Sequence, residues 1–271
     1  MFRVNPMDDI SQYNIKRWRA LAEANALFTR PRLDLTPTTA RAMIDPQSRL
    51  GDLRGKRVLC LAGGGGQQSA AYALLGADVT VVDLSAEQLE RDRQVATHYK
   101  VEIKTHQGDM RDLSALPKDT FDLVDQPYSI NFVPDVGDIF SQVARIIKPK
   151  GNYRVMCANP FAAGMTERDW NGDGYTMKRP YQQGERIVYE DQEWVYDRNE
   201  SAPVPRPQEF RHTLGTVING LVENGFIIRE LVDVVAINPD IQAGPGTWDH
   251  FTAVAPPWFV IYSVYRPDVF S

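Results

Sequence analysis

Short apolar runs alternate with amphipathic stretches in a regular rhythm from Arg57 onward. Such runs, bounded by glycine or polar residues, favour strands that are buried on both faces. The predicted strands cover residues 58–61, 78–83, 101–110, 121–124, 153–157, 226–228 and 256–266. Apolar residues at helical spacing fill the intervals between them and predict helices over residues 67–76, 85–99, 138–151 and 213–225. Ser85 and Gln88 are spaced as a capping box at the start of the second of these helices.

This alternation predicts an α/β fold with right-handed crossovers and a mostly parallel sheet that carries helices on both faces. Ligands of such sheets bind outside the carboxyl ends of the strands. Residues 1–50 contain a helical pattern over 11–28 and are expected to form an N-terminal helical cover, with the main domain at 51–271. Residues 159–211 break the rhythm and are expected to form an inserted lid on the substrate side, with a hairpin over 184–198.

Composition narrows the classes of function. The formal net charge is -5, which argues against a protein that binds nucleic acid by neutralising phosphates. The two cysteines, Cys60 and Cys157, lie in strand-like runs and form neither a disulfide framework nor a metal site. No signal-peptide pattern and no membrane-spanning stretch is present in the sequence, so we expect a cytoplasmic chain. Because the cysteines do not form a metal site, we also expect no bound metal.

Four glycines, Gly63 to Gly66, join the first of these strands to the following helix. Glycines at this position let the backbone approach a ligand closely, with helix N–H groups directed at it. The dinucleotide pattern G-x-G-x-x-G is only partly met, because Ser69 occupies the third glycine slot. Asp83 ends the second strand, where a carboxylate can accept both hydroxyl groups of a ribose.

Five strings in order resemble the class I S-adenosylmethionine-dependent methyltransferases: VLCLAGGGGQQS, VTVVDLS, GDM, FDLVDQPYSINFVPD and ARIIKPKGNYRV. The resemblance spans about residues 55–158, and the pattern of 213–265 fits the family's final helix and strands. It implies a Rossmann-like sheet of about seven strands with an antiparallel last strand, and S-adenosyl-L-methionine as the cofactor.

The resemblance also assigns roles to residues. The glycine turn would lie along the methionyl part of the cofactor, and Asp83 would bind the ribose. Asp109 and Met110 would bind the adenine, and Gln126 to Ser129 would face the methyl group. Tyr13, in the N-terminal helix, would reach the methionyl carboxylate. The expected cofactor residues are Tyr13, Ala62, Gly63, Gly64, Gly66, Gln68, Asp83, Leu84, Gln88, Gly108, Asp109, Met110 and Gln126.

Two positions depart from the family's pattern. Cys60 stands where many members carry an acid, and Ala62 stands where many have glycine. The contact to the methionyl amine would then fall to Gln67, Gln68 or a backbone carbonyl.

A hydroxyl or a protonated amine as methyl acceptor would need a base. His212, before a long helix, and His250, expected in a loop before the last strand, are candidates, together with Tyr128. The aromatic residues of 159–211 either line an apolar acceptor pocket or pack in a homodimer interface.

The sequence therefore predicts an S-adenosylmethionine-dependent methyltransferase that transfers a methyl group by in-line displacement to a small-molecule acceptor, with neither nucleic acid nor membrane as partner. A nicotinamide-dependent oxidoreductase and a non-catalytic adenosylmethionine-binding regulator are the alternatives.

Overall fold

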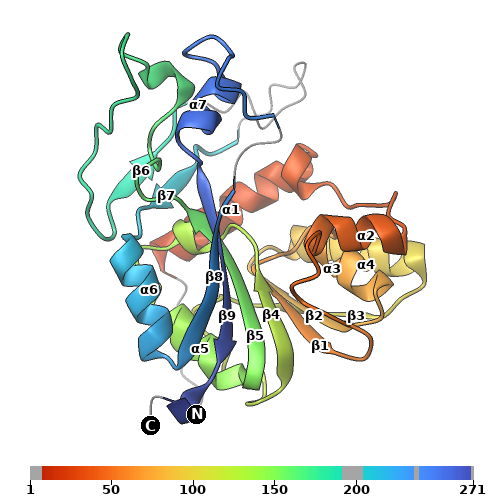
Figure 1. Ribbon diagram of the computed structural model, residues 1–271. Helices are drawn as coiled ribbons and strands as arrows, with labels where there is room; N and C mark the ends of the chain where they lie inside the picture. The colour runs from red at the N-terminus through yellow and green to blue at the C-terminus, as the bar shows by residue number, and fades with distance from the viewer. Residues whose placement is uncertain (1–7, 191–203, 235–237, 270–271) are drawn as a thin grey trace.

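The computed structural model describes residues 8–190, 204–234 and 238–269. A seven-stranded sheet with the order β3-β2-β1-β4-β5-β9-β8 forms the centre of the molecule (Figure 1). Its strands are β1 (Arg57–Leu61), β2 (Asp78–Asp83), β3 (Ile103–Gln107), β4 (Phe121–Gln126), β5 (Ile147–Ala158), β8 (Phe226–Val234) and β9 (Trp258–Tyr265). Strands β1 to β5 pair in parallel, and β9 is antiparallel to both β5 and β8. The predicted Rossmann-like sheet with an antiparallel last strand is confirmed.

Helices cover both faces of the sheet. The α-helices are α1 (Asp9–Glu23), α2 (Pro37–Ile44), α3 (Gln68–Leu74), α4 (Ala86–Tyr99), α5 (Gly137–Ile146), α6 (Leu214–Glu223) and α7 (Trp248–Val254). Figure 1 shows α2, α3 and α4 on one side of the sheet and α5 and α6 on the other. Helix α1 packs against α4, and helix α2 packs against α3. The division of the chain at residue 50 stays a prediction.

Side chains of the central strands alternate between two apolar cores. In β1, Val58 and Cys60 join the core under α2, α3 and α4, whereas Leu59 and Leu61 join the core under α5 and α6. All four are fully buried, as the apolar run predicts for a strand covered on both faces. Within the part of the chain that is described, no helix combines the length and the apolar character needed to cross a lipid bilayer.

Two helices and a small ribbon lie over the end of the sheet at which the parallel strands finish (top of Figure 1). They are α1, α7 and a two-stranded ribbon of β6 (Arg186–Val188) and β7 (Gln208–Phe210). Within the predicted hairpin over 184–198, Ile187 pairs with Glu209 of a distant segment, and the pairing within the hairpin stays a prediction. Residues 191–198 of that prediction lie outside the described residues. His250 lies in α7, capped by the Thr247 side chain, rather than in the expected loop.

A buried ion pair joins β4 to β5. Asp125 is fully buried, and its carboxylate accepts hydrogen bonds from Arg154 Nη1 at 2.6 Å and from the Tyr72 hydroxyl at 2.8 Å. The Arg154 guanidinium also lies over the Tyr262 ring, 5.9 Å from its centroid. Removing one partner of such a pair is expected to cost much more than removing a surface charge, because the other charge stays buried.

Arg154→Met is therefore expected to lower the free energy of unfolding by about 3–5 kcal/mol, measured by urea denaturation. Arg93→Met is the control, since Arg93 pairs with Glu90 on the exposed face of α4. This substitution should change the free energy of unfolding by less than about 1 kcal/mol. Equal effects of the two substitutions would contradict the assignment of Asp125–Arg154 as a buried pair.

Candidate functional site

The glycine turn between β1 and α3 is packed against residues of β2 and α4. A Cβ atom added at Gly64 would lie 2.8 Å from Gln88 Cβ and 2.9 Å from Asp83 Oδ2. One added at Gly66, whose φ is +71°, would lie 2.7 Å from the Arg91 carbonyl oxygen. These distances are shorter than carbon atoms tolerate, so both positions require glycine. The turn is thus a close approach of backbone to Asp83, Gln88 and Arg91, and the predicted approach to a ligand stays a prediction.

Asp83 lies at the carboxyl end of β2, directly beside this turn. Its Oδ2 accepts from the Gly64 amide and its Oδ1 accepts from the Ser85 amide, both at 2.9 Å. Burial raises the pKa of Asp83, and the amide hydrogen bonds oppose this rise. Each carboxylate oxygen keeps a further acceptor site, so Asp83 can also take hydroxyl donors from a ligand.

Gln88 supplies a second acceptor at the same place. Ser85 caps α4 by accepting from the Gln88 amide at 3.3 Å, but the return bond of the predicted capping box is not formed, because Asp83 already accepts from the Ser85 amide. The Gln88 side chain turns instead toward the glycine turn, where its buried Oε1 has no hydrogen-bond partner among the described residues. A buried acceptor without a donor is costly, and a ligand with hydroxyl or ammonium donors satisfies it. The turn, Asp83 and Gln88 therefore fit an adenosyl amino-acid ligand.

Asp109 follows β3 and lies in a network with the start of α1. Its Oδ1 accepts from the backbone amide and Nε of Arg111, and its Oδ2 accepts from Arg111 Nη2 at 2.7 Å and from the Ser11 hydroxyl at 2.8 Å. Arg111 also pairs with Asp8, the N-cap of α1. Burial alone would raise the pKa of Asp109, but the Arg111 hydrogen bonds hold it below its usual value. An adenine amino group at Asp109 must share a carboxylate that already accepts four hydrogen bonds.

The remaining expected cofactor residues surround these groups. The Gly108 amide donates to the Asp83 carbonyl, and the Leu84 carbonyl accepts from Gln107 Nε2. Met110 is buried, and its sulfur accepts from Gln126 Nε2 at 3.2 Å. Gln126 is itself fully buried, and its Oε1 accepts from the Tyr153 hydroxyl at 2.5 Å. The structure therefore places Gln126 inside the core at the end of β4.

The residues expected around the methionyl part lie between the glycine turn and the N-terminal segment. Ala62 has a left-handed φ of +48°, a conformation that glycine adopts more easily. Gln67 Nε2 donates to the carbonyl groups of Phe28 and Arg30, whereas Gln68 is half-buried at the start of α3. The Tyr13 hydroxyl donates to the Arg206 carbonyl at 2.7 Å and so joins α1 to the segment that leads into β7.

A carboxylate with two tyrosines lies beyond the end of β4. The Tyr128 hydroxyl donates to Glu209 Oε2 at 2.6 Å, and the Tyr189 hydroxyl donates to the same oxygen at 3.2 Å. Burial raises the pKa of Glu209 to about 6, although the two tyrosines lower it. Asn131 fixes the ribbon above β4 and β5, since it donates to the Phe210 carbonyl and accepts from the Ala158 amide.

Arg211 follows Glu209 by two positions and is fully buried in the segment that covers the sheet. Its Nη2 donates to the Ala163 carbonyl at 2.7 Å, and its Nε has no hydrogen-bond partner among the described residues. Burial lowers its pKa, while the charge of Glu185 opposes this. No carboxylate in the described part of the chain forms an ion pair with Arg211, and a buried cation in that state favours a ligand that carries a negative charge.

The two histidine candidates are engaged in internal hydrogen bonds. His212 Nε2 lies 2.9 Å from the Ile130 carbonyl and His212 Nδ1 lies 2.8 Å from Gln183 Nε2, which defines a neutral ring that donates at Nε2. Burial lowers the pKa of His212. His250 Nδ1 lies 2.9 Å from the Tyr175 hydroxyl, which also accepts from the Gly246 amide. Neither ring forms a hydrogen bond with Glu209.

Comparison with known proteins assigns the family. A family profile described as "Methyltransferase domain" matches residues 59–155. The uncharacterized methyltransferase YbaJ of Bacillus subtilis is 32% identical over 186 residues, which cover 68% of this chain and 70% of that protein.

The chain belongs to the class I S-adenosylmethionine-dependent methyltransferases.

Other members of this methyltransferase family match in part. A ubiquinone biosynthesis O-methyltransferase of Xanthomonas oryzae is 36% identical over 100 residues, which cover 37% of this methyltransferase and 42% of that protein. The crystal structure of an S-adenosylmethionine-dependent methyltransferase from Mesorhizobium loti superposes with a TM-score of 0.58 at 22% identity, covering 86% of this chain and 99% of that chain. The likeness to the Mesorhizobium loti structure shows a shared fold.

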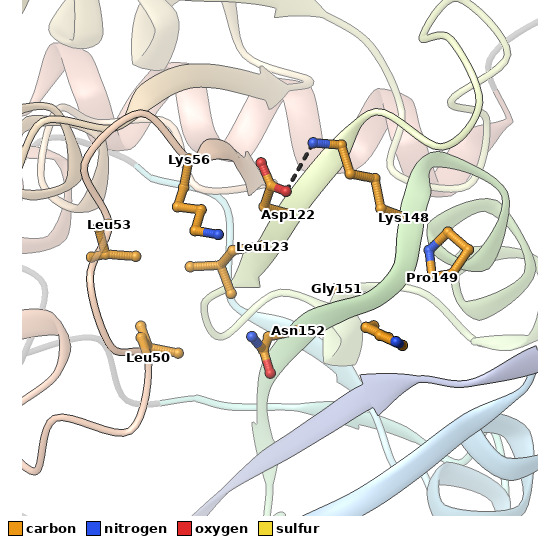
Figure 2. Close-up of a pocket in the computed structure, with 10 residues that line it drawn as sticks. Leu50, Leu53, Lys56, Asp122, Leu123, Lys148, Pro149, Gly151 and Asn152 are labelled. Atoms are coloured by element: carbon orange, nitrogen blue, oxygen red, sulfur yellow. Dashed lines mark hydrogen bonds and ion pairs between the residues drawn. The ribbon is translucent and has the colours of Figure 1, made fainter.

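A separate pocket lies at the other end of the methyltransferase sheet. It has a volume of about 240 Å³ and is lined by Leu50, Leu53, Lys56, Asp122, Leu123, Lys148, Pro149, Lys150, Gly151 and Asn152. Figure 2 shows Lys148 directed at Asp122, with which it pairs at 2.8 Å. These residues lie where β4 and β5 begin, whereas cofactors of parallel α/β sheets bind where the strands end. The pocket is therefore not part of the cofactor site.

Sequence reasoning missed four polar residues of the methyltransferase site: Asp92, Arg111, Glu209 and Arg211. The sequence contains a pattern that could have identified Asp92, because the helical spacing of Leu89, Asp92 and Val95 places it on the buried face of α4. No such pattern identifies Glu209 and Arg211, since their segment shows no periodicity and their partners lie far away in the sequence.

Proposed function

We propose that this methyltransferase transfers a methyl group from S-adenosylmethionine to a small-molecule acceptor that binds between the end of β4 and the β6–β7 ribbon. When bound, the cofactor supplies an activated methyl group on a sulfonium centre. The chain then has to hold the cofactor, orient the acceptor, exclude water and remove a proton.

Cofactor binding is assigned to the residues around the glycine turn. Asp83 would accept the ribose hydroxyls, and the unpartnered Gln88 Oε1 would accept a further donor. Gly63, Gly64 and Gly66 would give the methionyl part access to the backbone, with Ala62, Gln68 and Tyr13 around it. Gly108, Asp109, Met110 and Leu84 would border the adenine.

The observation that carries the proposal is the Tyr128–Glu209–Tyr189 cluster. Tyr128 belongs to the turn after β4, which the family places beside the methyl group, and Glu209 comes from the covering ribbon. Both tyrosines donate to Oε2, and no described residue donates a hydrogen bond to Glu209 Oε1. A carboxylate with a pKa of about 6 is largely ionised at neutral pH and still basic enough to take a proton. We assign Glu209 as the base, with Tyr128 orienting it.

This chemistry favours an acceptor with a hydroxyl or N–H group. The likeness to the Xanthomonas relative, a ubiquinone biosynthesis O-methyltransferase, supports an oxygen acceptor. The buried Arg211 favours an acceptor that also carries a carboxylate or another anion. The net charge of -5 supports a small molecule over nucleic acid. We place the enzyme in the cytoplasm, and the stacked exposed pair Phe161–Tyr181 is the surface we assign to a homodimer contact.

The test combines binding and turnover. Calorimetry should show binding of S-adenosylhomocysteine and no binding of NAD⁺ or NADH, which separates a methyltransferase from an oxidoreductase. Incubation with methyl-tritiated S-adenosylmethionine should label 3,4-dihydroxybenzoate more than catechol, since only the former offers an anion to Arg211. Cofactor binding without labelling of any phenol, amine or thiol would favour the non-catalytic regulator.

A further inference from the structure

Asp92 is a buried carboxylate that lies behind the glycine turn. It belongs to α4, is fully inaccessible to solvent, and accepts from the Gly65 amide at 3.2 Å and the Gly66 amide at 3.1 Å. Its Oδ1 also accepts from the Ser69 hydroxyl at 2.5 Å. The turn amides thus donate to an internal anion, and the opposite side of the turn faces Asp83 and Gln88.

Among residues 8–190, 204–234 and 238–269, no cation compensates the charge of Asp92. Asp83 on β2 and Cys60 on β1 are the titratable groups that face it, and the charge of Asp83 raises its pKa further. Arg91 on the same helix donates its Nη2 to the Ala22 carbonyl of α1 instead. Burial raises the pKa of Asp92 to about 7, although Ser69 and the glycine amides lower it. The carboxylate therefore gains or loses its proton near neutral pH.

Ser69 explains a departure noted in the sequence. It occupies the third slot of the G-x-G-x-x-G pattern, where glycine allows close helix packing. Here Ser69 is fully buried on α3, and its hydroxyl donates to Asp92 across the α3–α4 contact. The serine and the aspartate therefore act as one unit that joins both helices to the turn.

We propose that the Asp92–Ser69 pair holds the glycine turn in its cofactor-binding conformation, and that cofactor affinity depends on ionisation of Asp92. Asp92 is a positioning residue, because it reaches the cofactor only through the turn. The inference rests on the cofactor site proposed above and goes beyond it by assigning a pH-dependent control.

The chemistry of the donors gives the physical reason. Gly65 N–H, Gly66 N–H and Ser69 O–H all donate, so the ionised carboxylate satisfies them together. A protonated Asp92 would place its own O–H among these donors, and only the Ser69 oxygen could accept it. The protonated oxygen is neutral and a weaker acceptor for its turn amide, so the turn would be held less tightly in the conformation described.

The pH dependence follows from the ionised fraction. Apparent affinity falls in proportion to the population of the competent state, so binding should be about tenfold weaker at pH 6 than at pH 8. The effect on fold stability has the opposite sign. The pKa of Asp92 is higher in the folded than in the unfolded chain, so its contribution to stability is greatest below about pH 4 and is lost as pH rises to about 7.

The experiment is calorimetric titration with S-adenosylhomocysteine between pH 5.5 and 8.5. The wild-type enzyme should gain affinity with pH, with an inflection near 7. Asp92→Asn should bind at least about tenfold more weakly than wild type at pH 8, without an inflection. Ser69→Ala removes one donor to the ionised form and should move the inflection to higher pH, a shift that a merely structural role would not produce. Glu90→Gln, exposed on the same helix, should keep the wild-type profile.

The outcomes are distinguishable. A pH-independent affinity in the wild-type enzyme, or an inflection that Ser69→Ala leaves in place, overturns the role of Asp92 and leaves the proposed function intact. Absence of S-adenosylhomocysteine binding at every pH overturns the cofactor site and this inference together. If Asp92→Asn does not fold, the wild-type and Ser69→Ala profiles decide the question by themselves.

Discussion

Asp83→Ala should weaken binding of S-adenosylhomocysteine by about 2 kcal/mol or more, through loss of charge-assisted hydrogen bonds to the ribose. The structure adds a second reason. Asp83 Oδ2 accepts from the Gly64 amide, so its removal also frees the backbone of the glycine turn. Calorimetry at pH 8, where Asp92 is ionised, measures the loss.

Asp78→Ala is the matched control for this substitution. Asp78 begins the same strand, is exposed, and pairs with Lys104 at 2.8 Å at the opposite end of the sheet. Its removal should leave cofactor affinity at the wild-type value. Unchanged affinity in a folded Asp83→Ala variant would refute the ribose assignment.

Glu209→Gln is expected to lower turnover by about 100-fold or more, the range in which a general base contributes. Cofactor affinity should stay unchanged, because Glu209 contacts Tyr128 and Tyr189 and none of the residues of the glycine turn. Glutamine keeps the shape of the side chain and loses the basic oxygen. Tritium transfer to the best phenolic acceptor measures the loss.

The pH profile gives an independent check of Glu209. The base acts when ionised, so turnover measured with saturating cofactor should fall as pH drops through about 6, and Glu209→Gln should lack this limb. Tyr128→Phe removes a hydrogen bond to the ionised carboxylate and should move the limb to higher pH. Glu190→Gln is the control, since Glu190 is an exposed glutamate of the same covering segment. A Glu209→Gln variant that keeps full turnover would refute its role as the base.

Local patterns predicted the sheet and the position of Asp83 beside the glycine turn. The run Val58–Leu61 is buried on both faces, so its hydrophobicity alone identifies a central strand. Asp83 is the last residue of β2, and the end of a parallel strand fixes its position beside the glycine turn. These residues depend on neighbours close in sequence or on the regular geometry of the sheet.

Predictions were less accurate where a side chain had two local partners to choose from. Ser85 and Gln88 have the spacing of a capping box, but Asp83 takes the Ser85 amide and leaves Gln88 free to turn toward the glycines. His250 was expected in a loop because glycine and proline precede it, whereas the Thr247 cap starts a helix there.

The sequence by itself determined the class of fold, the family resemblance and the position of the glycine turn, because each is encoded in periodicity or in a contiguous string. Tertiary structure alone decided that Glu209 meets Tyr128, 81 positions away, and that Asp92 lies behind Gly65 and Gly66. The physical reason is that a buried carboxylate takes its pKa and its partners from the chain segments that fold around it. Those segments are brought together only by the packing of α4 on the turn and of the β6–β7 ribbon over the end of the sheet.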